Sequence, residues 1–69
     1  MIAIRKNLRE EIRITQEDFR GHDLLNIRVF YRNDDGKWRP GKQGVAIRME
    51  LVPEFLGALH QVVDTAEAA

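Results

Sequence analysis

The sequence contains no cysteine and no serine. Nucleophilic catalysis by these two side chains is therefore excluded, and the chain also lacks a glycine-rich phosphate loop and a pair of carboxylates suited to acid and base catalysis. Its two histidines each have one acidic neighbour, His22 with Asp23 and His60 with Asp64, which supplies at most two metal ligands where zinc needs three or four. We expect a protein that is not an enzyme and that uses no metal and no cofactor.

Long hydrophobic runs are also missing. The first seven residues, MIAIRKN, contain no apolar stretch long enough for a signal peptide, and no segment approaches the roughly 20 apolar residues of a membrane span. The lack of cysteine agrees with a reducing compartment. These absences predict a soluble intracellular protein with no membrane partner, in the cytoplasm or nucleoid, or in the nucleus if the source is eukaryotic.

The chain is short, at 69 residues, and we expect one domain over residues 1–69. Its ordered core should span about residues 4–63, and the tail 64–69 (DTAEAA) should fray. A domain of this size buries only about 60% of the surface that its unfolded chain exposes. Because neither disulfides nor a zinc site can support it, association is the remaining means of stabilisation, and we expect a homodimer.

The net charge of zero hides an uneven distribution. All 11 basic residues lie between Arg5 and Arg48, together with seven acidic ones, so this part carries +4. The remaining residues, from Met49 to Ala69, contain four acidic side chains and no lysine or arginine, which gives −4. This asymmetry fits one basic, polyanion-binding face, although a chance division of the charges would look the same.

Alternating polarity predicts strands in the first half of the chain. Residues 8–15 alternate in their second half, where Ile12 and Ile14 share a face. Residues 16–23 (QEDFRGHD) then supply a polar turn around Gly21, and residues 24–32 give the strongest strand pattern. Its period of two places one set of side chains on each face: Leu25, Ile27, Val29 and Tyr31 on the first, and Leu24, Asn26, Arg28, Phe30 and Arg32 on the second.

A hairpin should follow at residues 33–36, because Asp35-Gly36 suits a primed two-residue turn. A third strand would return through residues 37–39 and end at Pro40-Gly41, since proline donates no hydrogen bond to a sheet. Alternation resumes over residues 45–51, which predicts a fourth strand.

A helix is predicted from Val52, where Pro53 is tolerated in the first turn and Glu54 favours the helix dipole. Its apolar stripe has spacings of three and four residues: Val52, Phe55, Leu56, Leu59, Val62 and Val63. Strands followed by a helix indicate an α+β domain, in which the helix covers one face of an antiparallel sheet.

Residues 19–44 mix aromatic rings with cations: Phe19, Phe30, Tyr31 and Trp38 beside Arg20, Arg28, Arg32, Lys37, Arg39 and Lys42. Rings that stack on bases, set among cations that neutralise phosphates, are typical of proteins that bind single-stranded nucleic acid without reading its sequence. The same side chains also build ordinary half-buried sheets, so this pattern alone leaves both interpretations open.

The order FRGHDLLNIRVFY, a short acidic turn ending in glycine, RPGKQGVAI and a C-terminal helix resembles a known family. The sequence is similar to the single-stranded DNA-binding domain of the transcriptional coactivator positive cofactor four and its small bacterial relatives, from about Ile4 to Leu59. The most specific matches are Phe19-Arg20-Gly21, Ile27-Arg28, and Pro40-Gly41-Lys42 with Gly44.

This resemblance implies a strongly curved four-stranded antiparallel sheet followed by one helix, in a homodimer whose paired sheets form a groove for single strands or melted duplex. It implies that Phe19 and Tyr31 stack on bases, and that Pro40 and Gly41 shape a loop that presents Lys42. Phosphates would be contacted by Arg20, Arg28, Arg39 and Lys42.

Four positions depart from the family pattern and should weaken binding. Gln43 stands where a second lysine is common, Tyr31 where a tryptophan is familiar, and His22 and Glu17 where basic residues can occur. Trp38 replaces an aliphatic residue and could return some stacking surface. The complete candidate set for nucleic-acid binding is Phe19, Arg20, His22, Arg28, Tyr31, Trp38, Arg39 and Lys42.

Each ring also has a structural alternative. Phe19 could be a hydrophobic plug under its turn, Trp38 a packing residue, and Phe30 a contact to a dimer partner rather than to a base. Strict alternation would separate Tyr31 from Arg28, so only a bulge or strong coiling near Arg32 would place both in one groove.

We therefore predict a single-stranded DNA-binding homodimer with little sequence preference and a role in transcription or DNA maintenance. Two alternatives remain: a module that binds the transcription machinery with weak or no DNA binding, or an RNA-binding module.

Overall fold

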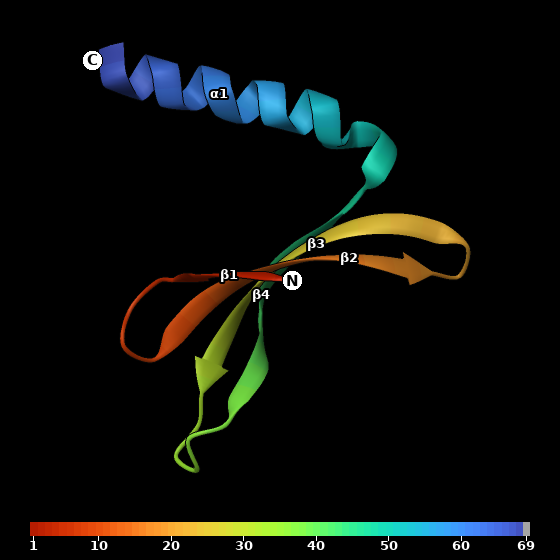
Figure 1. Ribbon diagram of the computed structural model, residues 1–69. Helices are drawn as coiled ribbons and strands as arrows, with labels where there is room; N and C mark the ends of the chain where they lie inside the picture. Colours follow the sequence, from red (N-terminus) through yellow and green to blue (C-terminus); the bar gives the residue numbers. More distant parts are fainter. Residues whose placement is uncertain (69) are drawn as a thin grey trace.

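The computed structural model describes residues 1–68 and contains four strands followed by one helix (Figure 1). The elements are β1 (Ile2–Arg5), β2 (Glu10–Phe19), β3 (His22–Arg32), β4 (Trp38–Arg48), a 3-10 turn η1 (Met49–Leu51) and the helix α1 (Val52–Ala68). The strands form one antiparallel sheet in the order β1-β2-β3-β4. The predicted α+β class, the four-stranded sheet and the C-terminal helix are confirmed.

The assignment of residues to strands needs two corrections. β1 was not predicted, because four residues are too few for a clear alternation; Ile2 and Ile4 pair with Ile14 and Ile12 of β2. The third and fourth predicted strands are instead one continuous strand, β4, and Pro40 does not end it. Because β4 is an edge strand, the side of Pro40 that lacks an N–H donor can face away from β3, so no hydrogen bond of the sheet is lost.

The β2–β3 connection is tighter than the polar turn suggested. Phe19 pairs with His22, so Arg20 and Gly21 alone form the loop. Their φ values of 53° and 81° are both positive, as a type I′ turn requires. The Gly21 N–H donates to Asp18 Oδ1 at 3.1 Å, which helps to hold the turn closed.

The β3–β4 connection differs from the predicted primed two-residue turn. The strands are joined by residues 33–37, and among residues 33–36 only Gly36 has a positive φ. Asn33 Oδ1 accepts hydrogen bonds from the backbone N–H groups of Asp35 and Lys37, at 3.0 and 2.9 Å. This side chain stabilises a longer loop and removes the need for a positive φ at Asp35.

The C-terminal segment also departs from the prediction. Residues 49–51 form η1 rather than the end of a strand, and α1 starts at Val52 as predicted. Residues 64–68 are helical, so the predicted fraying of the tail stays a prediction, and Ala69 lies outside the described residues.

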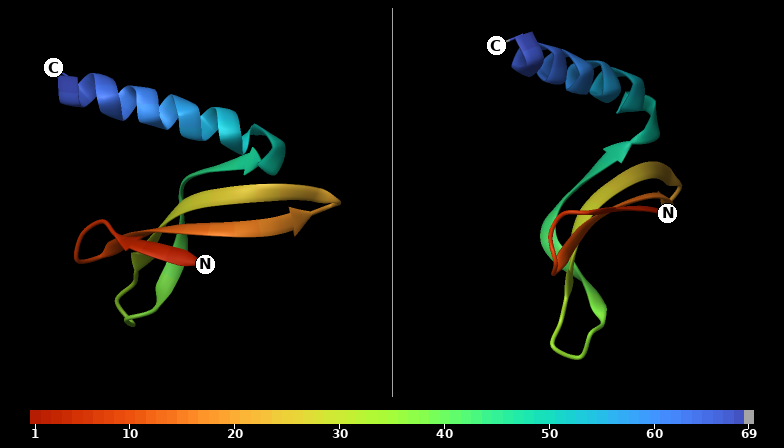
Figure 2. Two further views of the ribbon diagram at one scale, coloured as in Figure 1. Left: turned by 45° about the horizontal axis from the view of Figure 1, so that its top comes forward. Right: turned by 60° about the vertical axis from the view of Figure 1, so that its left-hand side comes forward.

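The helix does not cover the sheet of its own chain. Among residues 1–68, α1 contacts η1 and lies apart from the strands, on one side of the sheet (Figure 1; Figure 2). The expectation that α1 covers one sheet face within the chain is therefore wrong. β4 runs straight into η1, which reverses the chain, so that α1 runs back on one side of the sheet without packing against it (Figure 1).

The sheet has two chemically different faces. Its register and alternation place ten side chains on an apolar face: Ile2, Ile4, Ile12, Ile14, Leu25, Ile27, Val29, Tyr31, Val45 and Ile47. The opposite, mixed face includes Arg5, Glu11, Arg13, Thr15, Phe19, His22, Asn26, Arg28, Phe30 and Trp38. No side chain of residues 1–67 is fully buried, so the apolar face lacks a cover within the chain.

Candidate nucleic-acid interface

The tip of the β2–β3 hairpin carries three of the predicted binding residues. Phe19 is 56% exposed, which excludes a plug under the turn within this chain. The Arg20 guanidinium carbon lies 5.2 Å from the centre of the Phe19 ring. His22 stands directly opposite Phe19 in the register, on the mixed face. The primed turn thus presents a ring, a cation and an imidazole together at an exposed end of the sheet.

A β-bulge lies where the predicted loop around Pro40 was expected. Arg28 pairs with Gly44 and Phe30 with Pro40, so four steps along β4 match two along β3. Arg28 Nη1 donates to the Gly41 carbonyl at 3.0 Å. A Cβ at Gly44 would lie 2.9 Å from the Ile27 carbonyl oxygen and 3.0 Å from Arg28 Cζ. Glycine at this position therefore leaves the space through which the Arg28 side chain passes over β4 to reach Gly41.

The bulge does not bring Arg28 and Tyr31 to one face. It lies in β4, while β3 pairs with β2 without interruption from His22 to Tyr31. Tyr31 is 45% exposed and lines a hollow of about 160 Å³ with Lys42 and Gln43, next to Glu10. Arg39 is the register partner of Tyr31.

The predicted set is therefore divided. Phe19, His22, Arg28 and Trp38 lie on the mixed face, whereas Tyr31 and Arg39 lie on the opposite side of the sheet beside Lys42. Because Tyr31 and Arg28 alternate on an unbroken strand, they can contribute to one groove only if a strand of nucleic acid passes around the edge of the curved sheet.

Trp38 belongs to a cluster of rings and arginines on the mixed face. The Arg5 and Arg13 guanidinium carbons lie 5.8 and 6.0 Å from the centre of its ring. Arg13 also lies 4.2 Å from the centre of the Phe30 ring. Two cations thus already approach Trp38, which supports its packing role more than free stacking on a base.

Sequence reasoning missed Arg13 and Glu11. Arg13 Nε forms an ion pair with Glu11 Oε1 at 2.7 Å, and both side chains are largely shielded from solvent. Their i,i+2 spacing on one strand places both side chains on the same face, so the sequence could have predicted this ion pair. Only the pairing of β2 with β3 places Arg13 directly opposite Arg28.

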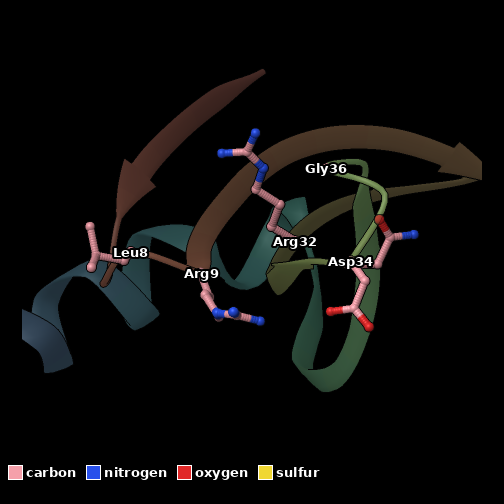
Figure 3. Close-up of a pocket in the computed structure, with 6 residues that line it drawn as sticks. Leu8, Arg9, Arg32, Asp34 and Gly36 are labelled. Carbon is pink, nitrogen blue, oxygen red and sulfur yellow. The ribbon is translucent and has the colours of Figure 1, made fainter.

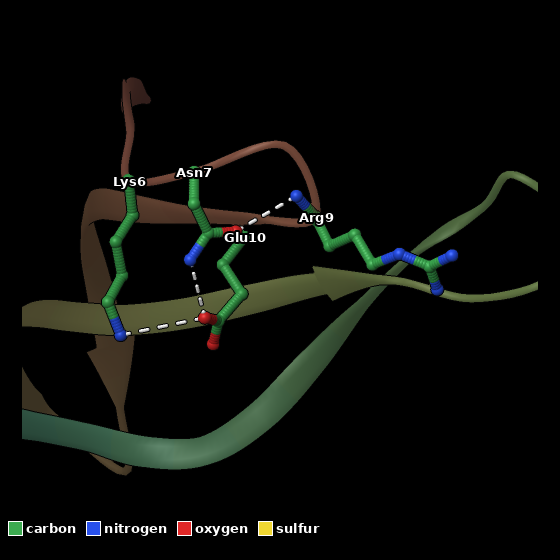
Figure 4. Close-up of polar contacts among 4 residues, drawn as sticks. All are labelled: Lys6, Asn7, Arg9 and Glu10. Carbon is green, nitrogen blue, oxygen red and sulfur yellow. Dashed lines mark hydrogen bonds and ion pairs between the residues drawn. The ribbon is translucent and has the colours of Figure 1, made fainter.

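Lys6 and Arg9 lie in the loop before β2, away from this cluster. Lys6 Nζ lies 3.7 Å from Glu10 Oε1, which also accepts from Asn7 Nδ2 at 2.8 Å (Figure 4). The Arg9 N–H donates to Asn7 Oδ1 at 2.9 Å, and its side chain points away from the network (Figure 4). Arg5 precedes this loop, as the last residue of β1.

A separate hollow of about 360 Å³ lies between the β1–β2 and β3–β4 connections (Figure 3). Its lining includes Leu8, Arg9, Arg32, Asn33, Asp34 and Gly36. The guanidinium groups of Arg9 and Arg32 point in different directions (Figure 3). This hollow therefore does not gather the predicted binding residues or focus charge on one point.

Within residues 1–68, no three His, Cys, Asp or Glu side chains come together in a group that could hold a metal ion. None of the helices in this part has both the length and the apolar character needed to cross a membrane.

The profile of one protein family, described as Transcriptional Coactivator p15 (PC4), matches residues 6–58. The chain belongs to this family. The match spans more than half of the sequence and confirms the resemblance to positive cofactor four, including the hairpin tip, β3 and the bulged part of β4.

Solved structures of PC4 homologues have the same fold. A homologue from Burkholderia pseudomallei is 27% identical, with a TM-score of 0.83, over 91% of this chain and 85% of that one. A bacteriophage T5 homologue, described as implicated in recombination-dependent DNA replication, is 25% identical, with a TM-score of 0.79, over 96% of this chain and 77% of that one. MoSub1 in complex with DNA is 24% identical (TM-score 0.64, 97% and 82% covered), a likeness of fold alone.

Proposed function

We propose that this PC4-family protein is a single-stranded DNA-binding homodimer with little sequence preference. The observation that carries the proposal is the hairpin tip, where exposed Phe19 and adjacent Arg20 supply stacking and charge at one point. Arg28 on the same face as Phe19 extends the cationic surface along β3. Stacking would contribute about 1 to 3 kcal/mol per base, and every base offers a flat face to it.

Single strands suit this site better than an intact duplex. In a duplex the faces of the bases are stacked on one another, so Phe19 could reach one only in melted or unpaired DNA. The other rings of the predicted set are less accessible, since Trp38 lies near two arginines. We therefore assign the principal stacking role to Phe19 and a secondary one to Tyr31.

A homodimer would cover the surfaces that a single chain leaves open. Leu56, Leu59 and Val63 of the helix stripe are each 45–50% exposed, and Val45 of the apolar face is 47% exposed. A second copy supplies a matching helix and a matching apolar face, which is the simplest way to bury both. The dimer would also present two copies of the hairpin tip.

The biological role that follows is in transcription or in DNA maintenance, through binding of exposed or melted strands inside the cell. Membership of a transcriptional coactivator family supports the first role. The phage homologue implicated in recombination-dependent DNA replication supports the second. Possible partners in the transcription machinery, and the absence of catalytic activity, stay predictions.

The test is a titration of labelled single-stranded, double-stranded and RNA oligonucleotides of one sequence at several salt concentrations. We expect tightest binding to the single-stranded DNA, and a log–log salt slope of about −0.7 per phosphate contacted. A sedimentation run with and without a thymine oligonucleotide would report the oligomeric state. Binding that does not respond to salt would contradict the phosphate contacts.

A protein-interaction module is the second candidate, and the open edge of β4 favours it. As the last strand of the sheet, β4 has one side that pairs with no other strand of the described chain. A peptide could add to this edge as a further strand. If none of the three oligonucleotides binds, this candidate becomes the better interpretation; a preference for the RNA would indicate an RNA-binding module instead.

A further inference from the structure

Two arginines face each other across neighbouring strands of the mixed face. Arg13 of β2 and Arg28 of β3 are direct register partners, and their side chains point to the same side of the sheet. Side chains in such positions have Cβ atoms only about 4.5–5.5 Å apart, and like charges placed there repel each other. Glu11 pairs with Arg13 alone, so an anion that contacts both arginines would remove the remaining repulsion.

The protein holds Arg13 in place without using most of its donors. Its Nε donates to Glu11 Oε1 at 2.7 Å, and its guanidinium lies over the Phe30 ring. In residues 1–68 this is the one hydrogen bond that the side chain donates, although a guanidinium carries five N–H groups. The terminal nitrogens of Arg13 are therefore fixed in position and free to bind a ligand.

Arg28 is held by an independent contact. Its Nη1 donates to the Gly41 carbonyl at 3.0 Å, in the bulge of β4. The missing side chain of Gly44 makes room for its guanidinium, because a Cβ there would lie 3.0 Å from Arg28 Cζ. Both arginines are thus positioned by other parts of the fold before any ligand arrives.

The acids on this face do not balance the cations. Glu11 lies opposite Arg5 in the register but forms its ion pair with Arg13, and Arg28 has no ion pair among the described residues. Glu17, the next acid along β2, instead accepts hydrogen bonds from Thr15 and Asn26. The cluster of Arg5, Glu11, Arg13 and Arg28 carries a net charge of +2.

We propose that Arg13 and Arg28 together bind one phosphodiester group of a single-stranded nucleic acid, with Glu11 as a positioning residue for Arg13. This site rests on the proposed function and adds Arg13 to it as a binding residue. A phosphate between the two guanidinium groups accepts charge-assisted hydrogen bonds from both and removes their repulsion. The site shares the mixed face with Phe19, so a strand that stacks at the hairpin tip can continue along β3 towards it.

The first experiment measures the affinity of Arg13→Gln, Arg28→Gln and the double variant for a thymine oligonucleotide across salt concentrations. We expect a loss of about two- to fivefold for Arg13→Gln, as for one exposed ion pair. Because one phosphate is shared, the double variant should lose about 0.7 of salt slope. Arg9→Gln removes the same charge from an exposed loop position and is the matched control.

The second experiment uses the carboxylate. Glu11→Gln keeps an oxygen that can accept from Arg13 Nε but removes the negative charge, so affinity should rise. Glu54→Gln in the first turn of α1 makes the same change of total charge and should have a smaller effect. In the Arg13→Gln background, the gain from Glu11→Gln should disappear, which a purely structural role of Glu11 would not produce.

The outcomes separate this site from the proposed function. If the wild-type protein binds the oligonucleotide but Arg13→Gln behaves like Arg9→Gln and Glu11→Gln like Glu54→Gln, the phosphate site is wrong and the function stands. A double-variant loss of about 1.4 in slope would indicate two separate phosphates and contradict sharing. A wild-type protein that binds no oligonucleotide contradicts both proposals. Thermal unfolding identifies any variant that does not fold. If Arg13→Gln does not fold, the affinity of Glu11→Gln compared with that of Glu54→Gln decides whether the phosphate site exists.

Discussion

At the scale of single residues, the hairpin tip has features that favour binding but reduce the stability of the fold. Arg20 has a φ of 53°, a conformation that residues other than glycine and asparagine rarely adopt. Its neighbour Phe19 is an aromatic ring left in solvent. Neither feature helps the chain to fold. Residues that the surrounding structure holds in an unfavourable conformation cluster at functional sites, so both features favour a binding role for this turn.

Phe19→Ala should therefore weaken binding without unfolding the protein. The expected loss is about 1 to 3 kcal/mol of binding free energy, the contribution of one stacked base, with an unchanged salt slope because no charge is removed. Titration of a single-stranded oligonucleotide at several salt concentrations would measure both. A large fall in the unfolding midpoint would instead indicate that the ring packs against something, such as a dimer partner.

Arg20→Gly should raise stability and lower affinity at the same time. Glycine adopts a positive φ freely, so the substitution should relieve about 1 kcal/mol of backbone strain while it removes a cation beside Phe19. Arg20→Gln is the matched control, since it removes the same charge and keeps the strain. Chemical denaturation and oligonucleotide titration of both variants should show equal losses of affinity, but a gain in stability for Arg20→Gly alone.

At the scale of elements, the bulge in β4 decides where the side chains of the β3–β4 hairpin point. Two glycines permit it: a Cβ at Gly41 would lie 2.8 Å from the Val29 carbonyl oxygen, and one at Gly44 would lie 2.9 Å from that of Ile27. The alternation of β3 was predicted correctly, because it depends on that strand alone. The bulge was not, because it depends on how a neighbouring strand fits against β3.

Gly44→Ala should destabilise the protein. The added methyl group would press on the Ile27 carbonyl and on the Arg28 guanidinium, at an expected cost of about 1–3 kcal/mol in the free energy of unfolding. Gly57→Ala in α1 is the control, since a Cβ there meets nothing within 4 Å and should stabilise the helix by about 0.5–1 kcal/mol. Urea denaturation would measure both, and a neutral Gly44→Ala would contradict the close approach of β3 and β4.

At the scale of the whole molecule, the single chain leaves most of its apolar surface uncovered. It has an apolar sheet face, an amphipathic helix that lies apart from that face, and no fully buried side chain among residues 1–67. The hydrophobic effect gives little stability to such an arrangement until those surfaces are covered. Association of two copies is the expected solution.

Leu56→Gln should weaken the homodimer. Leu56 is 49% exposed in the single chain, so an isolated protein would tolerate the change with little loss. If a second copy covers the helix stripe, burial of the exposed half of each leucine contributes about 0.7–1.5 kcal/mol, and the substitution acts twice per dimer. Sedimentation at a series of concentrations should show dissociation at higher concentration than for the wild type. Gln61→Ala, on the side of α1 opposite the apolar stripe, should leave the association unchanged.

The sequence by itself determined those features that depend on a single segment. The period of two in residues 24–32 assigned the two faces of β3, the spacing in residues 52–63 assigned the helix, and Arg20-Gly21 lay in a segment recognised as a turn. The tertiary structure decided what depends on two segments meeting. Strand register placed Arg13 opposite Arg28 and Trp38 near Arg5, and the bulge left Tyr31 on the other face. The reason is physical: alternation follows from the geometry of one strand, whereas register and bulges follow from the fit between strands that are far apart in the chain.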